Sequence, residues 1–187
     1  MRFRSLPVLA VLSGGLLAGC APAHVPEPVT VKYGANDDNA QFEFWRQLSE
    51  RPLTSNDEAF HGLLLYLYQK DPVSDYAARV RLLKDRAMLP ASFDRPGDEA
   101  VSRGVLAVAV ARVLKIRGGL MMHLTGNNPR YSLLELQDME LFPPSSENQT
   151  FSGGEFVGII GKMEDYQHGD TGKLPATDLG PPAAGTR

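Results

Sequence analysis

In the central part of this chain, the pattern of apolar and polar residues is the one typical of α-helices. Apolar residues recur every three or four positions, which places them on one face of an α-helix. Outside a short piece at 120–122, no segment has the strict alternation of a half-buried strand. We therefore expect an all-α fold, with a first helix around Phe42, Trp45 and Leu48, followed by helices over 55–69, 75–88, 102–116, 132–141 and 152–163.

Serine residues mark the starts of several predicted helices. Ser55, Ser132 and Ser152 are each followed three positions later by a glutamate. This is the sequence of a capping box, in which the serine side chain accepts a hydrogen bond from the third helical amide and the glutamate bonds back to the serine amide. Prolines end several helices because they cannot continue the helical hydrogen bonding, at positions 72, 90 and 143–144.

The helical region contains an internal repeat with a period of about 50 residues. Each unit consists of a short helix, a loop and a longer helix that begins at a serine. One such pair cannot bury its own apolar faces, so we expect three units to pack around one core. The aligned stretches are 80–90 with 133–143, 101–107 with 151–157, and a fainter first copy at 44–48 and 55–60.

This unit resembles the S-layer homology domain, whose second helix opens with a T-R-A-E-F-like motif. The resemblance covers residues 41–166 and implies three helix-loop-helix repeats packed as a three-pronged pseudo-trimer. It also implies grooves that bind cell-wall polysaccharide through the motif's arginine and its neighbours. The second unit keeps the arginine of the motif and the third keeps the glutamate. The candidate ligand-binding residues are Ser102, Arg103, Ser152, Gly153, Gly154 and Glu155.

The residues of this motif also have structural interpretations. Arg103 lies in the first turn of its helix, where a cation opposes the helix dipole, so it either meets a ligand or pairs with an acidic side chain. Gly153–Gly154 either offer backbone amides to an anion or allow close packing between repeats. Glu58 and Glu155 are expected as capping residues, and Trp45 as a core residue rather than a platform for a sugar ring.

The N-terminal segment has the pattern of a bacterial export signal. Arg2 and Arg4 precede an apolar run over 6–17, which is too short to span a bilayer. The run ends in Leu17-Ala18-Gly19-Cys20, which resembles the lipobox of bacterial lipoproteins. The resemblance implies that residues 1–19 are removed and that Cys20, the only cysteine, carries a lipid anchor to the membrane. Alanine at position 21 then implies sorting to the outer membrane.

Composition divides the rest of the chain into three parts. Residues 20–40 are rich in proline, asparagine and aspartate, which predicts a flexible tether that holds the domain tens of ångströms from the membrane. Residues 41–166 are long enough for one hydrophobic core. Residues 167–187 are glycine, proline, alanine and threonine with few large apolar groups, which predicts a disordered tail.

Charge and motif content exclude several classes of function. Without the signal, the chain has 17 basic and 22 acidic residues, so we expect no nucleic-acid partner. The sequence has no nucleophile elbow, no phosphate-binding glycine loop and no zinc motif. His61 lies within an apolar helix and is expected to be a buried structural residue. We therefore expect no enzyme activity, no cofactor and no metal.

These patterns together predict an exported lipoprotein of the cell envelope. The leading hypothesis is a membrane-anchored helical domain that binds or organises wall polysaccharide or other surface material. The alternative is a scaffold that binds another envelope protein and has lost glycan binding.

Overall fold

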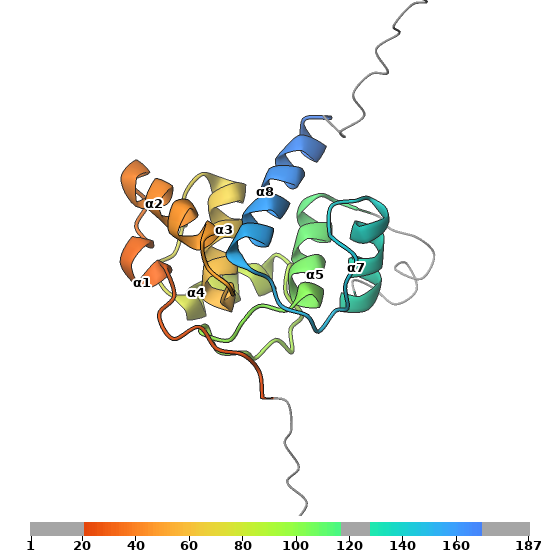
Figure 1. Cartoon of the computed structure of the whole chain (residues 1–187), viewed down its shortest axis with the longest axis horizontal. Coiled ribbons are helices and arrows are strands. Elements are labelled where there is room, and N and C mark those ends of the chain that lie inside the picture. The colour runs from red at the N-terminus through yellow and green to blue at the C-terminus, as the bar shows by residue number, and fades with distance from the viewer. Residues whose placement is uncertain (1–20, 117–127, 170–187) are drawn as a thin grey trace, which may run out of the picture.

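The computed structural model describes residues 21–116 and 128–169, and these form an all-α fold as expected. The signal peptide, Cys20 and all but the first three residues of the predicted tail lie outside the described residues. Within them there are isolated bridges but no strands. The described helices are α1 (Thr30–Tyr33), α2 (Asp38–Ser49), α3 (Asn56–Tyr68), α4 (Tyr76–Asp85), α5 (Arg103–Val113), α7 (Pro129–Asp138) and α8 (Gly153–Gln167) (Figure 1).

Serines cap the three helices α3, α5 and α8. The hydroxyl of Ser55 accepts from the Glu58 amide at 3.2 Å, while the Glu58 carboxylate accepts from the Ser55 amide at 2.7 Å. Ser152 and Glu155 form the same capping box, at 3.2 and 2.9 Å. Ser102 caps α5 through its hydroxyl without a glutamate at the third position. Two of the predicted capping boxes are therefore confirmed.

The third predicted capping box, at Ser132, is wrong. Helix α7 begins three residues earlier, at Pro129, and its cap is the side chain of Asn128, which accepts from the Arg130 amide at 3.0 Å. Ser132 lies inside the helix, fully buried. Proline is well suited to the first helical position because its φ is already helical. It has no N–H, but an N–H at this position would have no acceptor within the helix.

The helices pack as three pairs around a common core. Helix α2 packs against α8, α3 against α4, and α5 against α7. Figure 1 shows α5 and α7 side by side, with α8 between this pair and α2. Each helix of the three pairs contributes at least one fully buried side chain to the core: Phe44, Phe60, Leu83, Leu106, Leu136 and Phe156.

The buried face of α2 differs from the predicted one. The sequence pattern assigns Phe42, Trp45 and Leu48 to the core, but Phe42 is 65% exposed. Phe44 and Leu48 are fully buried and Trp45 is half-buried beside Phe44. The buried residues of α2, Ala40, Phe44 and Leu48, are four positions apart. Phe42 is two positions from Phe44, which turns its side chain by roughly 200° around the helix and away from the core.

The predicted tether is wrong over the described part of residues 20–40. Val25 and Val29 are each only 5% exposed. The Val25 amide donates to the Asp98 carbonyl at 2.7 Å, and the Ala100 amide donates to the Ala23 carbonyl at 2.8 Å. The chain is therefore docked on the domain from Ala23 onward, well before the predicted boundary at residue 41.

Polar contacts extend this docking to the start of α1. The Val29 amide donates to the Glu58 carboxylate at 2.7 Å, and the Arg51 side chain donates to the Glu27 carbonyl at 2.5 Å. Thr30 donates its hydroxyl to Asp57. Composition predicted a tether because proline, asparagine and aspartate are frequent in the segment. The structure holds the segment through two buried valines and the hydrogen bonds of a few amides.

Among the described residues, no helix is long and apolar enough to cross a membrane. The longest, α8, has 15 residues. At about 1.5 Å per residue it is shorter than the roughly 30 Å of a bilayer's hydrocarbon core.

Candidate functional site

The starts of the serine-capped helices are connected to one another through backbone hydrogen bonds. The first amide of each helix donates to a carbonyl in the segment that leads to another of these helices. This satisfies a backbone group that would otherwise lack a partner at a helix start. The three bonds join Asn56 to Glu99 at 2.8 Å, Arg103 to Gln149 at 2.8 Å, and Gly153 to Arg51 at 2.9 Å.

Arg103 lies at one of these junctions and is bound by the protein itself. It is only 7% exposed. Its Nη2 donates to Glu155 Oε1 at 2.7 Å and its Nε to the Thr150 carbonyl at 3.1 Å. The guanidinium also lies 4.7 Å from the ring centroid of Phe151. Arg103 was expected to meet either a ligand or an acidic side chain, and the structure shows the acidic side chain, Glu155.

Glu155 completes the same contact. Burial raises the pKa of its carboxyl, but hydrogen bonds from the Ser152 amide and from Arg103 outweigh burial and hold the pKa below its usual range. One carboxylate oxygen accepts from Arg103 and the other from the cap of α8. The side chains of Arg103 and Glu155 therefore meet each other directly.

The glycines of the motif lie where two backbones approach closely. A Cβ added at Gly153 would lie 1.6 Å from the Leu48 carbonyl oxygen, and one at Gly154 would lie 3.3 Å from the Ser49 carbonyl oxygen. Gly153 is buried in this contact. These positions match the packing interpretation of the glycine pair. Cys20, the predicted lipidation site, lies outside the described residues.

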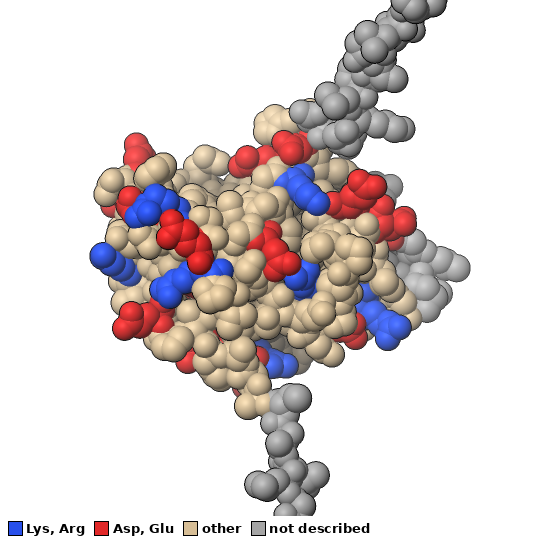
Figure 2. Space-filling model, viewed as in Figure 1, with Lys and Arg blue, Asp and Glu red and all other residues tan. Residues whose placement is uncertain are grey.

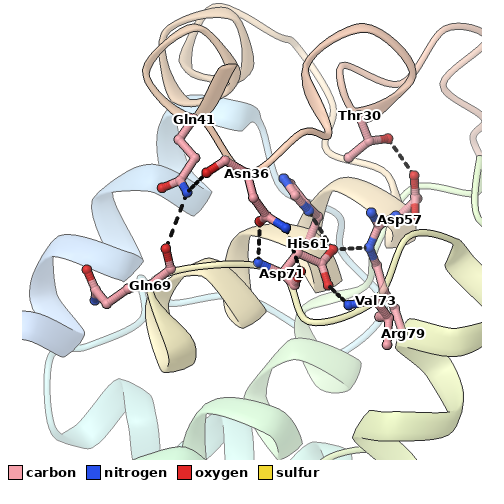
Figure 3. A network of polar contacts seen from close by, with 9 residues as sticks. All are labelled: Thr30, Asn36, Gln41, Asp57, His61, Gln69, Asp71, Val73 and Arg79. Atoms are coloured by element: carbon pink, nitrogen blue, oxygen red, sulfur yellow. Dashed lines mark hydrogen bonds and ion pairs between the residues drawn. The ribbon is translucent and has the colours of Figure 1, made fainter. Parts of the chain in front are cut away.

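A buried polar network that the sequence analysis did not identify lies between α3 and α4 (Figure 3). Asp71 is at its centre and is 3% exposed. Its Oδ2 meets His61 Nδ1 at 2.7 Å and accepts from Arg79 Nε at 2.5 Å. Arg79 Nη1 donates to Asp57 at 2.5 Å. The only sequence signal for it was a histidine inside an apolar helix, which needs a polar partner.

The network holds the N-terminal segment in place. Asn36 makes two bonds to the backbone of Asp71, donating to its carbonyl at 2.8 Å and accepting from its amide at 2.6 Å. Thr30 contacts Asp57 from the other side (Figure 3). Because its members bond to one another and to the chain, we interpret the network as structural.

Hydrogen bonding keeps Asp71 ionised in this network. Burial raises the pKa of its carboxyl, but hydrogen bonds from His61, Arg79 and the Val73 amide together lower it below the ordinary 3.8. His61 is fully buried, and its Nε2 has no hydrogen-bond partner. The ring lies edge-on against Phe44 at 4.7 Å.

A cavity of about 460 Å³ borders this network. Its charged wall includes Asp57 and Arg79, which already pair with each other. No group of histidine, cysteine, aspartate or glutamate side chains in the described ranges is arranged to hold a metal ion. On the face that Figure 2 shows, basic and acidic side chains are interspersed over the surface.

A second hollow, of about 300 Å³, lies between α2, α3 and α8. We call it the α2–α8 groove; it is lined by Gln41, Trp45, Leu65, Tyr66, Gln69, Val157, Ile160, Gly161 and Glu164. Two aromatic rings, two amides and one carboxylate thus share one concave surface. The volume falls at the lower end of the range typical of ligand pockets.

The hydroxyl of Tyr66 is the unusual group in the α2–α8 groove. It is buried and has no hydrogen-bond partner. Burial, and to a smaller extent Glu164, raises the pKa of Tyr66, so the hydroxyl keeps its proton. A buried hydroxyl without a partner is costly, which is the state a ligand with polar groups would relieve. A side chain added at Gly161 would enter open space, since its Cβ meets nothing within 4 Å.

Comparison with known protein families, with characterised proteins and with solved structures finds no match for this chain.

Proposed function

We propose that this protein is an exported envelope lipoprotein, anchored to the membrane through acyl chains on Cys20, whose three-unit helical domain binds envelope glycan. The lipobox-like sequence supports the anchor, and the arrangement of helices supports three units similar to S-layer homology domains. The α2–α8 groove is the glycan site of this proposal.

The helix pairs support three equivalent units. Taking α2 with α3, α4 with α5, and α7 with α8 as units, each short helix packs against the long helix of a different unit. The pairs α2–α8, α4–α3 and α7–α5 are related by a cyclic shift of one unit. Pairing of this kind is expected when incomplete units bury their apolar faces against one another.

The helix ends support the same conclusion for the second and third units. Helices α4 and α7 are both followed by a non-glycine residue in the left-handed region, Ala87 at φ 53° and Glu140 at φ 59°. The Leu83 carbonyl accepts two amides beyond α4, and the Leu136 carbonyl accepts two beyond α7. Left-handed conformations are uncommon outside glycine, and these two lie at aligned positions of the sequence repeat.

The unpartnered Tyr66 hydroxyl is the observation that carries the glycan assignment. Sugars present apolar C–H faces and many hydroxyl groups, so an aromatic and amide-lined hollow suits them. Trp45 and Tyr66 offer rings with polar tips, and Gln69 offers an amide. Because Glu164 adds a negative charge, the groove favours a neutral glycan over an anionic polymer.

The test compares two glycines on the same helix. Gly161 lines the groove, whereas Gly158 is exposed, has open space around it and is not part of the groove lining. We expect the chain 21–187 to sediment with isolated peptidoglycan sacculi, and Gly161→Leu to reduce binding at least tenfold. Gly158→Leu should bind as the native chain does. Tyr66→Phe should weaken binding without loss of folding.

Absence of sedimentation above a control, or equal binding by both leucine variants, would contradict the glycan assignment.

A protein partner is the second candidate function. The motif arginine, which binds glycan in the resembling family, is here paired with Glu155 at 2.7 Å. Large apolar side chains are instead exposed on α1 and α2: Val31 is 83% exposed and Phe42 is 65% exposed. A protein partner that covers these side chains would remove their apolar surface from water. A stoichiometric envelope protein that co-purifies with the native chain and is lost with Phe42→Ser would favour this function.

The anchor has its own test. The native chain should fractionate with membranes and yield an N-terminal peptide whose mass includes acyl chains on Cys20. Cys20→Ser should leave the protein unacylated, because no other cysteine is present. An unmodified Cys20 in the native protein would overturn the anchor.

A further inference from the structure

The first residues that the structure describes run along a fixed segment of the domain. Ala23 and Val25 bond to the backbone of Ala100 and Asp98 at 2.8 and 2.7 Å. His24 between them forms an isolated bridge with Glu99. Its Nδ1 also lies 3.2 Å from an Asp98 carboxylate oxygen. The segment is therefore paired with the domain over a few residues rather than free of it.

The segment that pairs with residues 23–25 is itself fixed to the core. The Val101 amide donates to the Thr54 carbonyl at 2.9 Å, and the Asn56 amide donates to the Glu99 carbonyl at 2.8 Å. Val101 is fully buried and Ala100 is 6% exposed. The position of Ala23 is therefore fixed relative to the start of α3.

The distance from the anchor to this fixed point is short. Only Ala21 and Pro22 lie between Cys20 and Ala23. Three residue steps span at most about 10 Å even when fully extended. Resting on the proposed anchor at Cys20, we propose that the domain lies directly on the bilayer, with the edge formed by residues 22–24 and 94–98 against the lipid headgroups.

The chemistry of this edge suits headgroups rather than acyl chains. His24 is close to Asp98, and Arg95 pairs with Glu99 at 2.5 Å. The turn around Arg95 and Pro96 is exposed. Asp94, Asp98 and Glu99 outnumber Arg95, so the edge is net negative and suits zwitterionic headgroups better than an anionic surface. The partner of this edge is the bilayer that holds the anchor.

This orientation places the α2–α8 groove away from the membrane. Helix α3 begins beside the docked N-terminal segment, and Tyr66 lies ten residues beyond Asn56 on that helix. Ten helical residues rise about 15 Å. In Figure 1 the described chain begins at the bottom of the molecule and α8 ends at the top. A groove at the far end would face material beyond the membrane, as a wall-binding site must.

The test anchors the mature chain, residues 20–187, by coupling its single thiol at Cys20 to a maleimide lipid in phosphatidylcholine vesicles. Trp45 is the only tryptophan and serves as the energy donor to a dansyl headgroup lipid. A 20-residue Gly/Ser insertion between Pro22 and Ala23 adds a span of about 25 Å. The same insertion after Gly169, at the other end of the domain, is the matched control.

We expect the first insertion to reduce energy transfer at least twofold and the second to leave it unchanged. The backbone amides of residues 94, 95, 97 and 98 should also exchange more slowly on vesicles than in solution for the native chain. For the first insertion, the two exchange rates should be equal. Equal transfer in the native chain and the first insertion would overturn the proposal. Because the coupling is chemical, this result does not depend on lipidation in the cell, which the Cys20→Ser comparison tests separately.

Discussion

At the scale of single residues, Gly153 has the least room of the described glycines. An added Cβ would lie 1.6 Å from the Leu48 carbonyl oxygen and 2.6 Å from the Leu48 carbonyl carbon. Both atoms are backbone, so α8 or α2 would have to move. The side chain of no other residue type fits here while the two helices keep their contact.

We predict that Gly153→Ala strongly destabilises the protein, whereas Gly158→Ala on the same helix stabilises it. The first change forces α2 and α8 apart, with an expected loss of several kcal/mol, as overpacking costs about 1–3 kcal/mol and occasionally more. The second removes a flexible glycine from an open helical position and should gain about 0.5–1 kcal/mol. Urea unfolding of the two variants measures both. Similar midpoints for the two variants would contradict the close approach.

A second residue-scale prediction concerns the pH dependence of stability. The pKa of Asp71 is lower in the folded chain than its ordinary 3.8, because the hydrogen bonds from His61 and Arg79 outweigh burial. A lowered carboxyl pKa stabilises the folded state above pH 3.8, and this stabilisation is lost as the pH falls through the folded value. We therefore expect the free energy of unfolding to decrease steeply below about pH 4.

Asp71→Asn checks this dependence. It should cost about 3–5 kcal/mol at neutral pH, because it leaves Arg79 buried without its central partner, and it should flatten the decrease below pH 4. Asp165→Asn, at an exposed position on α8, is the control and should keep the native profile. The measurement is urea unfolding between pH 3 and 7. An unchanged acid slope in Asp71→Asn would rule out this role.

Individual side chains were only partly predictable from the sequence. Ser55 and Ser152 were identified as caps because a capping box is a local pattern within four residues. The Asp71 network was missed because its members come from different segments, and only the fold brings Arg79 next to Asp57. Arg103 was left with two interpretations for the same reason: its partner Glu155 is 52 positions away.

At the scale of the helices, the three serine caps are not equivalent. Ser55 and Ser152 form reciprocal capping boxes, while Ser102 accepts one longer bond of 3.4 Å from the Val105 amide. Ser55 is also fully buried. Removal of the cap should therefore lower the free energy of unfolding more at a helix start that is buried and reciprocally hydrogen-bonded.

We predict that Ser55→Ala costs more stability than Ser102→Ala. Loss of an N-cap typically costs about 1 kcal/mol, within a range of about 0.5–2 kcal/mol. Ser55→Ala should fall at the upper end because it leaves the buried Glu58 amide without a partner, and Ser102→Ala at the lower end. Thermal unfolding of both variants by circular dichroism gives the comparison. The reverse order would show that the capping geometry does not set these energies.

Helix positions were predictable where start signals were clear and unreliable where signals competed. The starts of α3, α4, α5 and α8 fall within one residue of the predicted ranges. The start of α7 was misplaced because Asn128 and Pro129 form a better start than Ser132. The predicted tether failed because composition describes average behaviour, while docking depends on where Val25 and Val29 meet the domain.

At the scale of the whole molecule, the backbone bonds between helix starts close a ring. Thr54 donates to the Phe151 carbonyl and Gly153 to the Arg51 carbonyl, both at 2.9 Å, which joins the last helix start to the first. Phe151 and Phe156 are fully buried. The core is therefore shared between segments at both ends of the domain.

We predict that removal of α7 and α8 unfolds the rest of the chain. The chain 21–116 would lose the partners of Thr54 and Arg103 and would expose the core that Phe151 and Phe156 cover. The chain 21–169 should unfold in one cooperative transition, and 21–116 should have no cooperative transition. Circular dichroism during heating distinguishes the two. A sharp transition in 21–116 would mean that the helices from α1 to α5 form an independent core.

The sequence by itself determined the helical class, most helix starts and two capping boxes, and it predicts the lipobox-like export signal. These features depend on residues within a few positions of one another, so local spacing is sufficient to define them. Only the tertiary structure decided that Arg103 meets Glu155, that Asp71 joins His61 to Arg79, that Trp45 and Tyr66 share a groove, and that the N-terminal segment is docked. Each of these depends on contacts between distant segments, because the energy that fixes them arises only when the helices share one core.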